Sequence, residues 1–65
     1  MSNKYNSIAN EFAAELRGLK RDYPTTTQPR LGAWRVINCW IANERKLNQR
    51  FDADRFVAYI NERAD

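Results

Sequence analysis

Apolar residues recur every three or four positions along the first third of the chain. From Tyr5 onward the steps are three, four, four, three and four, which gives Tyr5, Ile8, Phe12, Leu16, Leu19 and Tyr23. This spacing places the side chains on one face of a helix. Ser2 or Asn3 is a suitable cap for its first turn, and Pro24 disfavours helical geometry at the residue before it. The pattern therefore predicts a helix near residues 3–21.

A second helical pattern follows a connector that contains three threonines and two prolines. Thr27 is a good N-cap, with Pro29 in the first turn, where no N–H donor is needed. At 100° per residue, the apolar side chains cover an arc of roughly 160°. These side chains are Ala33, Trp34, Val36, Ile37, Trp40, Ile41 and Leu47. Trp34 and Trp40 point about 120° apart, so we expect a helix near 29–47 that lies between two neighbouring helices.

The third helix has the clearest start signal in the chain. Asp52 is the expected N-cap, and Phe51 and Phe56 form a hydrophobic staple on either side of it. Asn48 is expected to close the preceding helix in the left-handed conformation. The predicted fold class is all-α, a compact three-helix bundle with the second helix central, in a single domain that spans residues 1–65. Its helices are expected near 3–21, 29–47 and 52–64.

Composition limits both the ways to hold so short a chain together and the chemistry it can perform. The 65 residues include one cysteine, Cys39, and no histidine. An internal disulfide and an imidazole zinc site are therefore excluded, and the usual general base of enzymes is missing. Two Trp, three Phe and three Tyr make aromatic burial the expected main source of stability. We expect a non-enzymatic protein with no metal and no cofactor, in which Cys39 is structural.

The cellular setting is indicated by what the chain lacks. No stretch reaches the roughly 18 apolar residues of a membrane span, and the first residues contain no apolar signal core. An unpaired thiol suits a reducing compartment. These features predict a cytoplasmic protein without a membrane partner.

Basic and tyrosine side chains are the candidate binding groups. Eleven Lys and Arg against eight Asp and Glu give a net charge of +3, which favours acidic partners. The candidates are Arg17, Lys20, Arg21, Arg30, Arg35, Arg45, Lys46, Arg50, Tyr23 and Tyr59. Because Tyr and Arg anchor protein interfaces, protein binding is the leading hypothesis. Binding of nucleic acid phosphates is the alternative, although Asp52 and Asp54 would repel phosphate at the start of the third helix. A homodimer is a further way to add burial to so small a domain.

The segment Asn48–Val57 adds a resemblance to a known group of proteins. Its Asn-Gln-Arg-Phe-Asp-Ala-Asp-Arg-Phe sequence resembles the Asn-x-x-Phe-Asp-x-x-Arg-Phe ending of a type of small bacteriophage protein. Ile8–Ala13 and Trp34–Ile37 are similar to the group's first helix and its Trp-containing helix. The resemblance implies a phage or prophage origin and an accessory role in the bacterial cytosol. It implies a protein that binds, and inhibits, a protein of the host.

Overall fold

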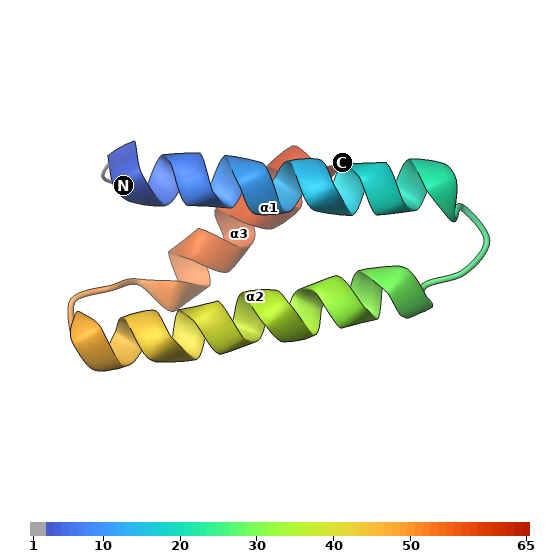
Figure 1. Cartoon of the computed structure of the whole chain (residues 1–65). Coiled ribbons are helices and arrows are strands. Elements are labelled where there is room, and N and C mark those ends of the chain that lie inside the picture. The colour runs from blue at the N-terminus through green and yellow to red at the C-terminus, as the bar shows by residue number, and fades with distance from the viewer. Residues whose placement is uncertain (1–2) are drawn as a thin grey trace.

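Three α-helices make up the computed structural model of the chain, which describes residues 3–65 and the side chains from Lys4 onward. They are α1 (Asn3–Asp22), α2 (Gln28–Leu47) and α3 (Ala53–Ala64), and residues 3–65 contain no strand. The all-α bundle is confirmed, and each helix bound lies within one residue of the prediction. The proposed caps Ser2 and Asn3 lie outside the described side chains. α1 and α2 run antiparallel side by side, and α3 crosses behind α1 (Figure 1).

The helix that packs closely against both others is α1. The prediction that the second helix is central is therefore not confirmed. Ala9 and Ala13, one turn apart on α1, are completely buried. Such small side chains let the backbone of a neighbouring helix approach closely, because the distance between packed helices depends on the side chains at the contact. α2 instead reaches α3 through the large ring of Trp40, which keeps the two backbones further apart.

An aromatic cluster fills the core between the three helices. The Trp40 ring stacks on the Phe56 ring, with their centroids 5.1 Å apart and an angle of 22° between the planes. Phe12 and Tyr5 of α1 meet these two rings edge-on. Edge-on and stacked pairs add about 0.5–1.5 kcal/mol each beyond burial of their area. Trp40 therefore connects all three helices through its aromatic contacts.

The local signals at the helix ends act largely as predicted. Asp52 caps α3, because its Oδ1 accepts a hydrogen bond of 3.0 Å from the backbone N–H of Arg55. The rings of Phe51 and Phe56 lie 5.3 Å apart, as the staple requires. Thr27 is the N-cap residue of α2, but its side chain makes no capping hydrogen bond.

The prediction of a left-handed Asn48 is wrong. Asn48 is extended, with φ −140° and ψ 98°. Its backbone N–H donates to the carbonyl oxygen of Glu44 at 2.8 Å, and its side-chain amide donates to the Tyr5 hydroxyl at 2.9 Å. These two hydrogen bonds close α2 without a residue of positive φ.

The covered arc of α2 is narrower than its apolar pattern indicates. Val36 and Leu47, which were expected to be covered, are 64% and 84% exposed. The buried residues of α2 are Ile37, Ile41 and Glu44. Because α3 covers only one side of the α1–α2 pair, the other edge of the arc has no neighbouring helix (Figure 1).

Glu44 is the charged residue at the middle of this covered arc. It is only 8% exposed. Its Oε1 accepts hydrogen bonds from the Tyr5 hydroxyl at 2.6 Å and from Lys4 Nζ at 3.3 Å. The hydrogen bond from Tyr5, with a smaller contribution from Lys4, lowers the pKa of Glu44 although partial burial acts in the opposite direction. The Glu44 carboxylate therefore connects α1 to the end of α2 through these hydrogen bonds.

The lowered pKa of Glu44 predicts how stability responds to acid. A carboxyl group whose pKa is lower in the folded chain stabilises the fold above its unfolded pKa, and this contribution is lost as the pH falls through the folded pKa. The Glu44 contribution should therefore be complete at neutral pH and fall as the pH drops below about 4.5. We expect Glu44→Gln to lower the melting temperature at neutral pH and to flatten its decline in acid.

Thermal unfolding followed by circular dichroism across this pH range measures the effect. Glu62→Gln is the matched control, because Glu62 is exposed on α3 and its ion pair with Arg63 is a 4.0 Å contact at the surface. If Glu62→Gln and Glu44→Gln flatten the acid response equally, the assigned role of Glu44 is wrong.

Candidate basic binding pocket

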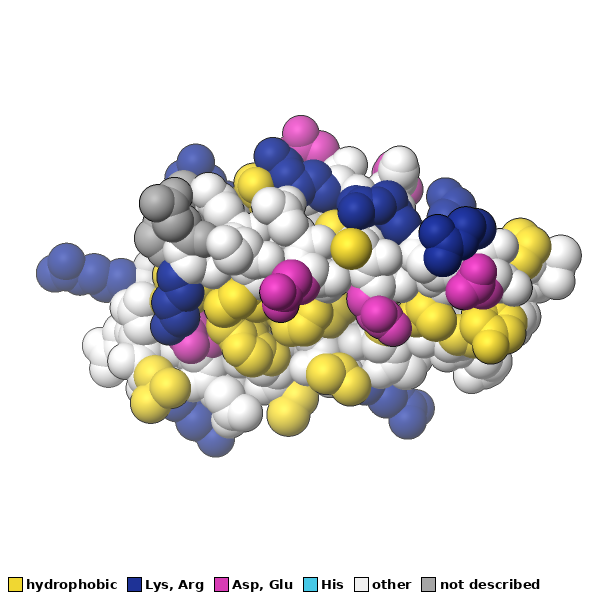
Figure 2. Space-filling view, turned by 45° about the horizontal axis from the view of Figure 1, so that its top comes forward, with side chains coloured by type: hydrophobic (Ala, Val, Ile, Leu, Met, Phe, Trp, Pro, Cys, Tyr) yellow, Lys and Arg dark blue, Asp and Glu magenta, His cyan; other side chains and the backbone are white. Residues whose placement is uncertain are grey.

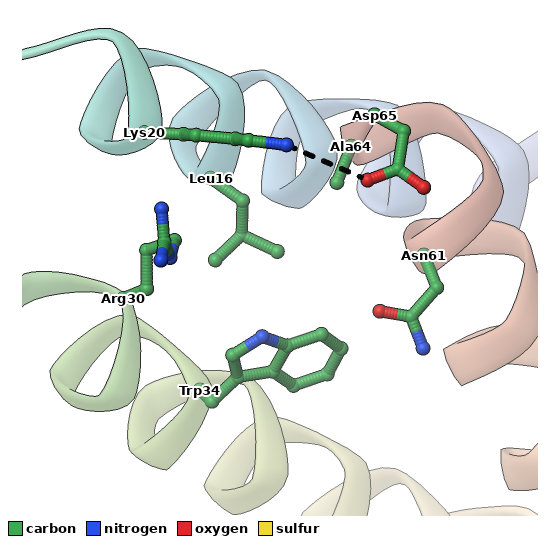
Figure 3. A pocket seen from close by; sticks show the side chains of 7 residues that line it. All are labelled: Leu16, Lys20, Arg30, Trp34, Asn61, Ala64 and Asp65. Carbon is green, nitrogen blue, oxygen red and sulfur yellow. Dashed lines mark ion pairs between the residues drawn. The ribbon is translucent and has the colours of Figure 1, made fainter. Parts of the chain in front are cut away.

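A cavity of about 320 Å³ opens where the C-terminal part of α1, the start of α2 and the end of α3 come together (Figure 3). This volume lies at the lower end of the range for small-ligand pockets. Its lining residues are Leu16, Lys20, Arg30, Trp34, Asn61, Ala64 and Asp65. We call this cavity the basic pocket.

The helices α1 and α2 each contribute two side chains that are four residues apart in sequence. α1 supplies Leu16 and Lys20, and α2 supplies Arg30 and Trp34. Residues at this spacing lie one above the other on the same face of a helix. The α1–α2 connector then returns the chain so that these two faces meet. The spacing along each helix and the reversal of the chain at the α1–α2 connector therefore suffice to bring Lys20 and Arg30 to the basic pocket.

The Trp34 ring points into the middle of the basic pocket, with Lys20 and Arg30 to one side and Asn61 across from them (Figure 3). Trp34 and Arg30 are half-buried. Lys20 Nζ lies 3.9 Å from Asp65 Oδ1, and both of these side chains are largely exposed. Such an exposed pair contributes about 0–1 kcal/mol and opens readily.

Arg30 carries the uncompensated charge of the basic pocket. None of the ion pairs found among residues 4–65 involves its guanidinium group. A guanidinium group offers five N–H donors in a planar fork that matches a carboxylate or phosphate. Beside it, the face of an indole ring accepts an apolar or planar group. The basic pocket can therefore hold an anionic group that is attached to an apolar one.

Several predicted binding residues lie at this end of the molecule, but not all of them are available. Arg17 Nη1 donates to the backbone carbonyl of Arg63, in the last turn of α3. A cation is favourable there because of the helix dipole, so Arg17 holds α3 in place. Arg21 Nε pairs with Asp22 Oδ1 at 3.3 Å. Tyr23 is 49% exposed in the chain just after α1.

The remaining predicted residues do not converge on the basic pocket. Arg45, Lys46 and Arg50 are exposed around the α2–α3 connector, at the other end of a molecule that is 37 Å long (Figure 1). Arg45 lines a shallow hollow together with Asp52 and Asp54, whose carboxylates oppose its charge.

The last two predicted residues lie outside both groups. Arg35 is exposed on α2 and does not line the basic pocket. Tyr59 is half-buried, and the Arg63 guanidinium lies over its ring at 3.5 Å from the centroid. This cation–π contact gives Tyr59 a partner within its own helix.

Only Lys20 and Arg30 of the seven residues that line the basic pocket belong to the set predicted from the sequence, and Trp34 and Asn61 are the two missing residues with side chains suited to binding. Trp34 was expected to be a packing contact. Its position at the edge of the apolar arc of α2, one turn after Arg30, is the signal that separates it from Trp40. No local signal in the sequence identifies Asn61, because its place in the basic pocket depends on how α3 crosses the other two helices.

Comparisons with known proteins do not extend this description. No protein-family model, no curated protein and no solved structure matches the chain. None of the helices in the described part of the chain is long and apolar enough to cross a membrane.

Proposed function

We propose that this chain is a small non-enzymatic accessory protein that binds an acidic segment of another protein in the basic pocket. The observation that supports the proposal is the half-buried Arg30, which lacks an ion-pair partner among the described residues and lies beside the Trp34 ring in an open cavity. Trp, Tyr and Arg are the residue types that most often anchor protein interfaces.

Binding would use each group of the basic pocket differently. A carboxylate of the partner would accept two hydrogen bonds from Arg30, which makes a strong and directional contact. Lys20 would exchange its exposed contact with Asp65 for the incoming carboxylate at little cost. An apolar side chain next to the carboxylate would cover the Trp34 ring. The recognised feature is thus an Asp or Glu residue with an apolar neighbour.

The resemblance of Asn48–Val57 to small phage proteins extends the proposal to the identity of the partner. That resemblance implies an accessory protein that acts in the bacterial cytosol and binds a protein of the host. We propose that the acidic segment belongs to such a host protein, and that binding inhibits it by covering the surface around that segment.

Nucleic acid binding is the competing function, and its electrostatics differ. Contacts with many phosphates release counterions, so affinity falls steeply with added salt. Here most of the candidate basic side chains are divided between two ends of the molecule, and Asp52 and Asp54 line the same hollow as Arg45. This distribution favours a local contact with one or two carboxylates, whose affinity depends less on salt.

Fluorescence anisotropy with a labelled peptide of alternating Glu and Leu residues tests the proposal. We expect saturable binding that Arg30→Ala weakens by about 10–100-fold, equivalent to about 1.4–2.8 kcal/mol. Arg35→Ala is the matched control, because Arg35 is an exposed arginine of the same helix outside the basic pocket. It should change the affinity less than about twofold.

Two results would contradict this function. Equal losses for Arg30→Ala and Arg35→Ala would mean that general charge attraction, and not the basic pocket, binds the peptide. Tighter binding of random duplex DNA than of the peptide, with a steep dependence on salt, would identify a nucleic-acid-binding protein.

A further inference from the structure

A second surface of the molecule, which shares no residue with the basic pocket, has the properties of an interface. Between α1 and α2, a hollow of about 280 Å³ is lined by Phe12, Glu15, Ala33, Val36 and Ile37. Apolar side chains follow the seam between the two helices, on the side from which α3 is absent (Figures 1 and 2). We call this seam the open groove.

Exposed apolar side chains of α2 continue the open groove. Val36 and Leu47 are 64% and 84% exposed. They are eleven residues apart, or about three helical turns, and therefore lie on the same side of α2. Trp40, between them in sequence, is half-buried. In helical bundles, apolar residues that repeat every three or four positions pack against a neighbouring helix. The exposed apolar residues of α2 beside the open groove are typical of a bundle surface that lacks such a neighbour.

The charges along the two edges of the open groove are opposite in sign. Figure 2 shows acidic side chains along the α1 edge, and Lys and Arg side chains beyond α2 on the other edge. The residues at the α1 edge include Glu11 and Glu15, one turn apart. Arg35 directly precedes Val36, and Lys46 directly precedes Leu47. Each basic residue therefore lies about 100° from its apolar neighbour around the axis of α2. None of the ion pairs among the described residues involves any of these four side chains.

We propose that the open groove is the interface of a homodimer, in which a second copy of this chain covers it. Two copies can face each other through a twofold axis that runs parallel to the helices. This axis places α1 of each copy against α2 of the other and keeps the position along the helix unchanged. Because Glu15 and Val36 line the same hollow, Glu15 of one copy then lies level with Arg35 of the second copy.

The charges favour the twofold axis parallel to the helices over a twofold axis perpendicular to them. A twofold axis perpendicular to the helices would place α1 against α1, and the acidic edges would repel each other. With the parallel axis, each acidic edge meets a basic edge, and Val36 and Leu47 of both copies become buried in a four-helix interface. A 65-residue domain buries little surface on its own, so association adds the burial that a single copy lacks.

Sedimentation equilibrium over a wide concentration range tests the dimer. The wild-type chain should show twice the mass of one chain. Val36→Asp and Leu47→Asp should each weaken the dimer by at least ~10-fold, while the far-UV circular dichroism stays helical. Ala58→Asp is the control, because Ala58 is exposed on α3, which lies on the other side of the molecule from the open groove. It should leave the dimer unchanged.

A charge exchange tests the arrangement itself. Glu15→Lys should weaken the dimer, and Glu15→Lys combined with Arg35→Glu should restore it. A wild-type chain that remains monomeric at every concentration, including one whose groove is instead occupied by a different protein, would overturn the proposal. A dimer that is insensitive to Val36→Asp and Leu47→Asp, or a double variant that fails to recover, would also overturn it.

Discussion

Replacing Phe56 with alanine is expected to remove a large share of the free energy of unfolding of the protein. Phe56 is completely buried, and its ring contacts Trp40 of α2, Phe12 and Tyr5 of α1, and Phe51 before α3. Loss of a buried phenylalanine ring costs about 3–5 kcal/mol. At roughly 0.05–0.15 kcal/mol per residue, the whole domain has only about 3–10 kcal/mol of stability.

Urea unfolding followed by circular dichroism measures this effect. Phe56→Leu keeps most of the buried volume and should cost much less than Phe56→Ala. Tyr23→Ala, at an aromatic residue that is half exposed, should leave the unfolding midpoint nearly unchanged. If Phe56→Ala destabilised the chain by less than 1 kcal/mol, the aromatic cluster would not be the core.

The second large effect is expected at Trp40, and it separates the roles of the two tryptophans. Trp40 stacks on Phe56 and meets the rings of Phe12 and Tyr5 edge-on. We expect Trp40→Ala to cost about 3–5 kcal/mol. Trp34→Ala should cost clearly less, because that ring faces an open cavity and lacks aromatic partners among the described residues.

Both variants are compared by their urea midpoints at one protein concentration. Trp40→Phe, which retains an aromatic ring, should recover part of the loss at that position. A folded and stable Trp40→Ala protein that had lost only binding would place Trp40 in the interface with the partner and not in the core.

The helices and their ends could be predicted because the signals act over short distances. The cap at Asp52 and the staple of Phe51 with Phe56 involve residues at most five positions apart. The three- and four-residue steps of α1 similarly report one face of one helix. Such features are present in the sequence whatever the rest of the chain does.

The arrangement of the helices was harder to predict because it depends on contacts between distant residues. The apolar arc of α2 shows how much of the helix can be covered, but not which neighbouring helix covers it. Val36 and Leu47 were therefore wrongly predicted to be covered. Glu44 was overlooked for a related reason. A carboxylate is normally exposed, and its partners Tyr5 and Lys4 precede it by 39 and 40 residues.

The sequence indicated a type of side chain for the candidate site, but not where in the fold the site lies. Basic side chains were expected to bind, but the sequence could not distinguish Arg30, which lines a cavity, from Arg17, which holds the end of α3. That difference is set by where α3 ends. Asn61 and Asp65 reach the basic pocket for the same reason.

The most direct test of the proposed function uses the two tryptophans as internal probes. Each indole N–H gives its own cross-peak in a ¹H–¹⁵N correlation spectrum, and Trp34→Phe assigns them. On titration with the Glu–Leu peptide, we expect the Trp34 cross-peak to shift and saturate while the Trp40 cross-peak stays in place. A Trp34 cross-peak that does not move when the anisotropy shows saturation, or a larger shift at Trp40, would contradict binding in the basic pocket.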